Sequence, residues 1–206
     1  ERFAGEQVMT DCFFDLLGEN DVINSMCAKL YRREIIREYN IVSNPKLFMG
    51  EDLQFNLSYM MEIDRFYLLP EIVYEYEKYQ SVLTSRYHEN LFESRKESVA
   101  SLRAFLDHKQ LPCNLTYFLY LKLVISQTMQ DHAYHRPKKE RYAHIEAAIR
   151  QAAVREAMEH FQPEGRMQKL IARATRGGKV SRIDRYAWWI GLARRLMGSR
   201  VKRVSV

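Results

Sequence analysis

The sequence predicts an α+β protein that is predominantly α-helical. Apolar residues recur at helical spacing through most of the second half of the chain. Only short stretches of the first half show the alternation and the β-branched or aromatic content of strands. The three cysteines are too few for a disulfide framework and suit a reducing compartment. No uncharged apolar run reaches the roughly 18 residues of a candidate membrane-spanning helix, so none is predicted.

The first 87 residues combine helices with short strands. Residues 6–17 carry apolar side chains at helical spacing and are followed by Gly18, a common helix stop. The same spacing predicts a helix over residues 51–63. The other predicted elements are a strand over 26–31, one or two helical turns over 33–39, a turn at Asn44-Pro45, and strands over 65–70 and 72–79.

The texture of the sequence changes near residue 88, after which only helices are predicted. Three helical stretches cover residues 89–109, 114–135 and 138–161. A loop at Gly177-Gly178 separates them from one further amphipathic helix over 181–204. The prolines at the joints are Pro112, Pro137 and Pro163. This change divides the chain into two predicted regions, residues 1–87 and residues 88–206.

Three segments of the first region form a recognisable series. They are "CAKLYRREII" at 27–36, "GEDLQFN" at 50–56 and "IVYEYEKYQSVLTSRY" at 72–87. In that order and spacing they resemble the second half of bacterial family 2 glycosyltransferases with the GT-A fold, which build capsule, lipopolysaccharide and other surface polysaccharides. The resemblance covers about residues 5–90. It implies that residues 1–87 are the acceptor-side half of a GT-A catalytic domain and that residues 88–206 are a helical extension.

The chain departs from the family pattern because it lacks the family's first half. The family's nucleotide-binding strands and its Asp-x-Asp metal site precede these motifs, and no Asp-x-Asp occurs in this sequence. The chain, which starts at Glu1, is therefore expected to be the C-terminal part of a longer enzyme and to be inactive alone. The resemblance implies a nucleotide-sugar donor, a glycan or lipid-linked acceptor, and Mg or Mn in the full-length enzyme. No metal site is predicted within this chain.

The resemblance also assigns roles to particular residues. An inverting sugar transfer needs a carboxylate that takes the proton of the acceptor hydroxyl, and this role falls to Asp52 with Glu51 as its neighbour. Lys29, Arg32 and Arg33 are the candidates to face donor phosphate. The alternative for the acidic pair is ordinary, because carboxylates in the first turn of a helix favour its dipole. The alternative for residues 29–38 is a solvated charged face.

The C-terminal part of the chain is strongly basic. Residues 163–206 hold twelve lysines and arginines against two acidic residues, a net charge of +10, whereas residues 1–162 carry a net charge of −4. Such asymmetry indicates an anionic partner. Trp188 and Trp189 beside Arg194 and Arg195 are typical of a helix lying at a membrane interface.

Two other interpretations of this tail stay open. The helix can dock on its own domain through the tryptophans, or the charge can serve nucleic acid, which is the weaker alternative because no nucleic-acid motif accompanies it. The predicted location is the cytoplasm, with peripheral attachment at the inner face of the membrane. The competing function is a non-catalytic helical module that binds a membrane or nucleic acid through this tail.

Overall fold

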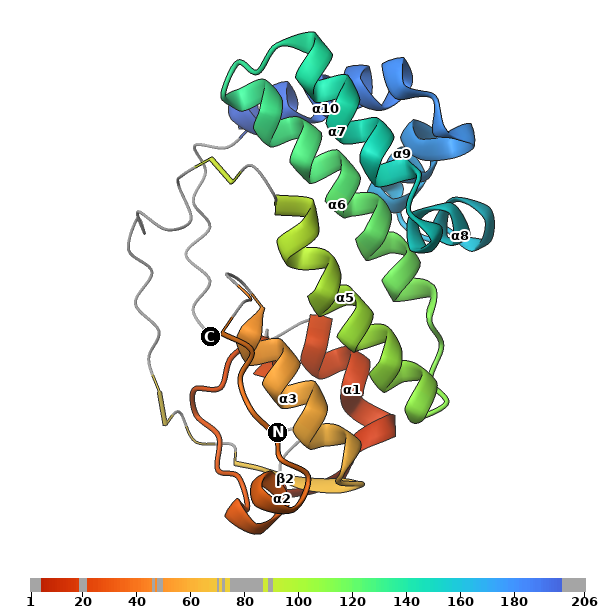
Figure 1. The fold of residues 1–206 in the computed structure, drawn as a ribbon. Helices are drawn as coiled ribbons and strands as arrows, with labels where there is room; N and C mark the ends of the chain where they lie inside the picture. The colour runs from red at the N-terminus through yellow and green to blue at the C-terminus, as the bar shows by residue number, and fades with distance from the viewer. Residues whose placement is uncertain are drawn as a thin grey trace. The chain divides into compact units, whose positions relative to one another are not determined.

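The computed structural model of the chain describes residues 5–18, 22–45, 47, 50–69, 71, 73–74, 87–88 and 91–197 (Figure 1). It divides into two compact units. Unit 1 contains residues 1–86 and 93–113, and unit 2 contains residues 87–92 and 114–206. Helices dominate the described residues and a single small sheet accompanies them, which confirms the predominantly helical α+β prediction at that coarse level.

Unit 1 holds the two-stranded antiparallel sheet, in which Gly5 pairs with Leu68 and Val8 with Arg65. The fully buried side chains of Phe13 and Phe105 meet with their ring centroids 4.5 Å apart and anchor its core. In chain order the elements are β1 (Gly5–Val8), α1 (Met9–Gly18), the 3-10 turn η1 (Val22–Asn24), α2 (Arg33–Glu38), α3 (Glu51–Met61), β2 (Arg65–Leu68) and, apart from its first two residues, α5 (Leu91–His108).

Two predictions for unit 1 were wrong. Residues 6–8 belong to strand β1 and not to the following helix, because their backbone groups pair with β2 and the Met9 N–H then bonds to the Asp64 carbonyl at 2.8 Å. No strand forms over residues 26–31. Ala28 has a φ of 55°, which a strand does not adopt. The backbone groups of Ser25 and Met26 bond to the side chains of Asn56 and Asp52 on α3 and not to a neighbouring strand.

The predicted helices 33–39 and 51–63 and the strand 65–70 are confirmed as α2, α3 and β2. The predicted strand over residues 72–79 lies almost entirely outside the described residues, and its described members Val73 and Tyr74 have no regular structure.

Unit 2 is a helical bundle built around α6. In Figure 1, α6 lies beside α7 and α10, and it contacts each of the helices α7 to α10. Its buried residues include Leu121, Val124 and Ile125. The helices are α6 (Asn114–Ala133), α7 (Lys138–Ile149), α8 (Ala152–His160), α9 (Arg166–Thr175) and α10 (Val180–Met197), with the 3-10 turn η2 (Arg176–Gly178) between the last two.

The predicted helix 138–161 is two helices. Gln151 has an extended conformation with ψ of 137°, which ends α7 and begins α8. The break allows Ile145 and Ala148 on α7, and Val154 and Ala157 on α8, all to be buried in contact with α6. No glycine or proline marks this break, so local sequence carries no signal for it.

A buried carboxylate joins α6 to α7. Asp131 is fully buried, and it accepts hydrogen bonds from the Tyr87 hydroxyl at 3.0 Å and from Gln127 Nε2 at 2.9 Å. His144 Nδ1 on α7 lies 2.9 Å from its other oxygen. Three partners compensate this carboxylate for its loss of water. Among the described helices, none is long and apolar enough to cross a membrane.

Candidate functional site

The acidic pair lies in the first turn of α3, directly after a residue with a left-handed backbone conformation. Gly50, the residue before the helix, has φ of 91°, and a Cβ at this position would collide with the Ser98 side chain. Glycine is therefore required by conformation and by space. Glu51 and Asp52 follow as half-buried residues at the positive end of the helix dipole. The dipole interpretation of the pair holds whatever further role Asp52 has.

Asp52 also holds the loop that carries the predicted phosphate-facing cation. Its Oδ2 accepts a hydrogen bond from the backbone N–H of Met26 at 3.1 Å. The bond spans 26 residues and ties the loop of residues 25–32 to the start of α3. The start of α3 is therefore in direct contact with Met26, the residue that precedes the "CAKLYRRE" segment.

Asn56 makes the strongest link between these two segments, and sequence reasoning missed it. It is 2% exposed; its Nδ2 donates to the carbonyl oxygens of Ile23 at 2.6 Å and Ser25 at 2.9 Å, and its Oδ1 accepts from the Tyr31 hydroxyl at 2.5 Å. The available signal was an amide in the "GEDLQFN" segment at a position that the helix buries. One buried side chain thus satisfies three polar groups, one in η1 and two in the loop of residues 25–32.

We expect Asn56→Leu to lower the free energy of unfolding of unit 1 by roughly 2–4 kcal/mol. The reason is that each buried polar group left without its partner costs about 1–3 kcal/mol. Urea denaturation measures the change. The matched control is Gln54→Leu on the same helix, because the buried Gln54 Oε1 has no hydrogen-bond partner among the described residues. Equal losses in both variants would show that the Asn56 bonds do not hold the loop.

Lys29 is the predicted cation that the structure brings to Asp52. Its ammonium donates to the carbonyl oxygens of Ser25 at 2.5 Å and Cys27 at 3.3 Å. Burial lowers the pKa of Lys29, while the Cys27 thiol and the Asp52 carboxylate oppose that shift. Burial, followed by the charge of Asp52, raises the pKa of Tyr31. The charge of Asp52 thus acts on Lys29, whose ammonium is held by two carbonyl groups of its own loop.

Arg32 and Arg33 are not drawn into this cluster. Both side chains are exposed, and Arg33 begins α2. The backbone N–H of Arg32 donates to the Tyr59 hydroxyl at 2.9 Å, so Arg32 anchors the loop through its main chain. Of the three predicted phosphate-facing residues, only Lys29 lies with the acidic pair. Among the described residues, no group of three His, Cys, Asp or Glu side chains could hold a metal ion.

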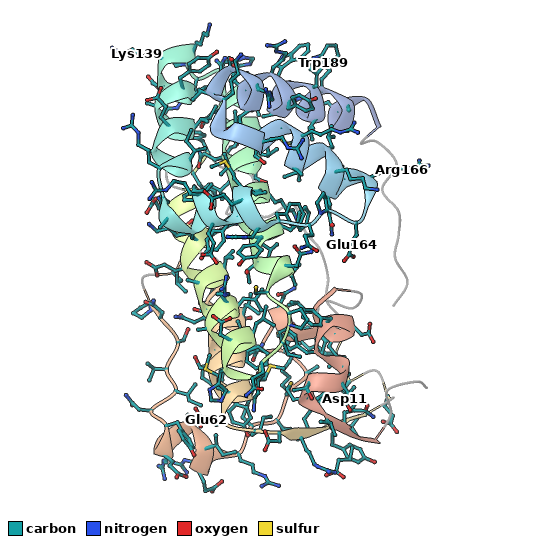
Figure 2. All side chains as sticks on the ribbon, turned by 90° about the vertical axis from the view of Figure 1, so that its right-hand side faces the viewer. Asp11, Glu62, Lys139, Glu164, Arg166 and Trp189 are labelled. Carbon is teal, nitrogen blue, oxygen red and sulfur yellow. The ribbon has the colours of Figure 1, made fainter. Side chains whose placement is uncertain are left out.

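The tail helix α10 docks on unit 2, but not through its tryptophans. Its buried side chains are Ile183, Ala187 and Ile190, which face α6, α7 and α9. Trp188 and Trp189 are 44% and 58% exposed, and Trp189 lies on the outer side of the helix (Figure 2). The alternative interpretation, in which the helix docks on its own domain through the tryptophans, is therefore wrong in that detail. Arg195 is exposed beyond this pair, and the side chain of Arg194 lies outside the described residues.

A carboxylate on α10, Asp184, fixes this helix to α6 and α7. Arg141 on α7 donates from Nε and Nη2 to the Asp184 carboxylate, at 2.9 Å and 3.2 Å. His132 Nε2 on α6 lies 2.8 Å from the same carboxylate. Burial alone would raise the pKa of Asp184, but the hydrogen bond from Arg141 and the charges of His132 and Arg141 outweigh burial and lower it. The ionised carboxylate is thus the form that the fold favours.

This lowered pKa gives unit 2 a defined acid sensitivity. A carboxylate with a depressed pKa in the folded state stabilises the fold above its unfolded value of about 3.8, and that stabilisation is lost as the pH falls through the folded pKa. At pH 7 we expect Asp184→Asn to cost roughly 1–3 kcal/mol. The difference from the unchanged protein should shrink below pH 4, as urea denaturation at several pH values measures. A constant difference would contradict the assignment.

Comparison of the chain with protein-family models, curated proteins and solved structures finds no match in any of the three. The resemblance to glycosyltransferases therefore rests on the sequence motifs alone.

Proposed function

We propose that this chain supplies the acceptor-side half of the catalytic domain of a family 2, GT-A glycosyltransferase. Such an enzyme transfers a sugar from a nucleotide-sugar to a surface-polysaccharide or lipid-linked acceptor. One observation carries the proposal: Asn56 of the "GEDLQFN" segment accepts a hydrogen bond from Tyr31 of the "CAKLYRRE" segment. Asn56 and Asp52 also hold the residues just before that segment, Ile23, Ser25 and Met26. Residues 27–34 and 50–56 are 16 to 29 positions apart in sequence, yet the bond between Tyr31 and Asn56 brings the two segments into contact.

In this proposal Asp52 is the base that takes the acceptor proton, and Glu51 helps to place the acceptor. Lys29 contributes positive charge near the leaving diphosphate, where electrostatic stabilisation is worth most. The divalent metal that the resemblance implies finds no ligand set among the described residues, so no described residue is assigned to it.

The test is a transfer assay on protein expressed from a coding sequence extended upstream of Glu1. The donors are uridine, guanosine and thymidine diphosphate sugars, with glycan and lipid-linked acceptors, and the readout is acceptor-dependent release of nucleoside diphosphate. We expect release with one donor class, and failure with every donor by a folded protein would overturn the proposal. Calorimetry on the 206-residue chain provides a second check, because tight metal-dependent binding of a nucleotide-sugar by this chain alone would contradict its assignment to the acceptor side.

A second proposal concerns the surface of unit 2, which we propose attaches the protein to an anionic membrane face. The observation that favours it is the exposure of Trp188 and Trp189, with ring centroids 4.8 Å apart, on a helix whose other face is already buried. Exposed tryptophans beside cations suit the interface of a bilayer.

Vesicle co-sedimentation tests the attachment. We expect the double substitution Trp188→Ser with Trp189→Ser to reduce pelleting with anionic vesicles, without a change in unfolding. The matched control is Tyr39→Ser, which removes a half-exposed aromatic ring from unit 1. Equal pelleting of the two variants would rule out the tryptophan pair as the anchor.

A further inference from the structure

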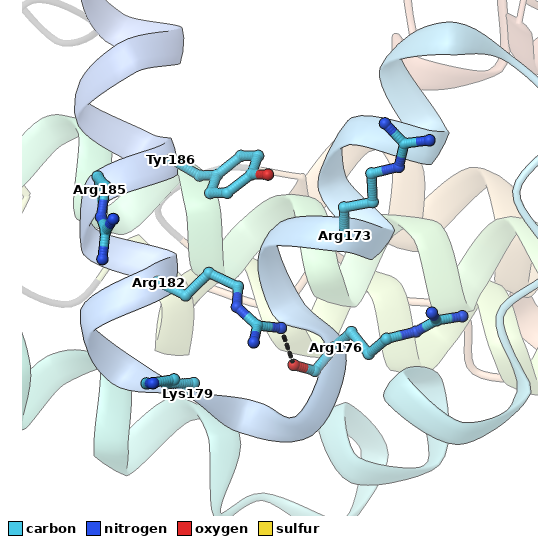
Figure 3. Close-up of a pocket in the computed structure, with 6 residues that line it drawn as sticks. All are labelled: Arg173, Arg176, Lys179, Arg182, Arg185 and Tyr186. Carbon is cyan, nitrogen blue, oxygen red and sulfur yellow. Dashed lines mark hydrogen bonds between the residues drawn. The ribbon is translucent and has the colours of Figure 1, made fainter.

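A basic groove lies between α9 and α10 (Figure 3). It encloses about 380 Å³, and five cations and one tyrosine line it. Arg182 reaches from α10 across the turn, where its Nη1 donates to the backbone carbonyl of Arg176 at 3.0 Å. The lining side chains are Arg173, Arg176, Lys179, Arg182, Arg185 and Tyr186. None of these residues was among the predicted site residues.

No acidic side chain balances this groove within the described part of the chain. Its lining contains no carboxylate, and none of the five cations forms an ion pair with a described residue. The acidic residue nearest in sequence, Asp184, is engaged by Arg141 and His132 on the inner side of α10. Five like charges held close together disfavour the unliganded state, and an anion with several oxygens relieves that repulsion.

An apolar groove continues directly from the basic one. It encloses about 590 Å³, and Arg185 and Tyr186 line both grooves. Met167 is 48% exposed here, and Trp189 is 58% exposed, so apolar side chains face solvent beside the cations. The apolar groove is lined by Met167, Leu170, Arg185, Tyr186, Trp189, Ile190 and Ala193.

We infer that the two grooves together bind one lipid that carries a phosphomonoester headgroup. Guanidinium groups bind phosphate oxygens in pairs, and a phosphomonoester presents three oxygens and close to two negative charges. The acyl chain would cover the Met167–Ala193 groove, which a soluble phosphate or a nucleic acid backbone has no means to fill. This inference deepens the proposed membrane attachment by assigning a discrete site to a single lipid, and it does not depend on sugar transfer.

The experiment uses the complete chain and a short-chain phosphatidic acid below its micelle concentration, so that no bilayer is present. Titration calorimetry and tryptophan fluorescence should show saturable binding of this lipid. Short-chain phosphatidylcholine and inorganic phosphate should each bind at least about tenfold more weakly, because each lacks one of the two matched parts. Since no vesicle is involved, failure of this titration leaves the vesicle result on the tryptophan pair unaffected.

Matched variants distinguish binding at this groove from general attraction to the positive charge of unit 2. Arg173→Gln with Arg176→Gln should weaken the phosphatidic acid by at least about tenfold. Arg155→Gln with Arg166→Gln removes the same charge from exposed positions outside the groove and should leave the affinity unchanged. Met167→Ser should weaken the lipid but not inorganic phosphate, and all of these changed side chains are exposed, so folding should be kept.

Four results would overturn the inference. They are no saturable binding of the phosphatidic acid, equal binding of inorganic phosphate, equal weakening by the control pair of variants, or tighter binding of a single-stranded oligonucleotide that Met167→Ser does not affect. The last result would assign the groove to nucleic acid.

Discussion

Under the proposed function, Asp52→Asn in the longer enzyme should lower turnover by about 10²–10⁴-fold, the usual contribution of a general base. The amide has the shape of the carboxylate, and its oxygen can still accept the Met26 N–H bond that holds the loop. It cannot take a proton from an acceptor hydroxyl. The loss should therefore appear in the rate of transfer, while the unfolding midpoint stays near that of the unchanged protein. Steady-state transfer assays and urea denaturation of the same preparations measure both quantities.

Glu51→Gln is the matched control for this experiment. It changes the neighbouring carboxylate in the same first turn of α3 and removes the same unit of charge from the helix start. We expect a smaller loss of turnover, because only one of two adjacent carboxylates can reach the acceptor proton. If Asp52→Asn loses less than about tenfold in turnover, Asp52 serves the loop and the helix dipole and is not the base.

Ile183→Ala should lower the free energy of unfolding of unit 2 by about 2–5 kcal/mol. Ile183 is fully buried on the docking face of α10, beside Ala187 and Ile190, so its truncation leaves a cavity at the contact with α6 and α7. For a unit of about 100 residues, each kcal/mol corresponds to roughly 4–8 °C in the melting temperature. Calorimetry of the complete chain measures the shift.

Trp188→Ala on the same helix provides the control, because its side chain is 44% exposed and leaves no cavity. We expect its cost to stay within about 1 kcal/mol. The reverse order of the two costs would mean that α10 docks through its tryptophans after all. This result also bears on membrane experiments, since removal of α10 deletes part of the core of unit 2, and point substitutions are therefore the valid test of attachment.

The contacts of the candidate site could be predicted only in part. The motif "GEDLQFN" and apolar spacing predicted both α3 and the acidic pair at its start, because helix periodicity and first-turn carboxylates are local properties. The joining of Asp52 to Met26 and of Asn56 to Ile23, Ser25 and Tyr31 spans 25 to 33 residues. Such pairings depend on how the loop closes over the helix, and no local pattern encodes them.

The cations of unit 2 show most clearly which properties are local and which are tertiary. The sequence by itself determined the basic character of residues 163–206, the loop at Gly177-Gly178 with the helix after it, and a spacing of three from Arg173 to Arg185. The helix before this loop, α9, was not predicted. On one continuous helix of 3.6 residues per turn, side chains three apart drift by about 60° a step, so five of them would wind most of the way around the axis.

The break in the chain brings these cations together instead. Gly177 and Gly178 adopt φ of 67° and 59°, values that glycine reaches without steric cost, and the turn ends α9 and starts α10. Burial of Ile171 and Ala174 on α9 and of Ile183 and Ala187 on α10 then sets the rotation of each helix. Those apolar contacts, and not the spacing of the charges, decided that the five cations line one groove.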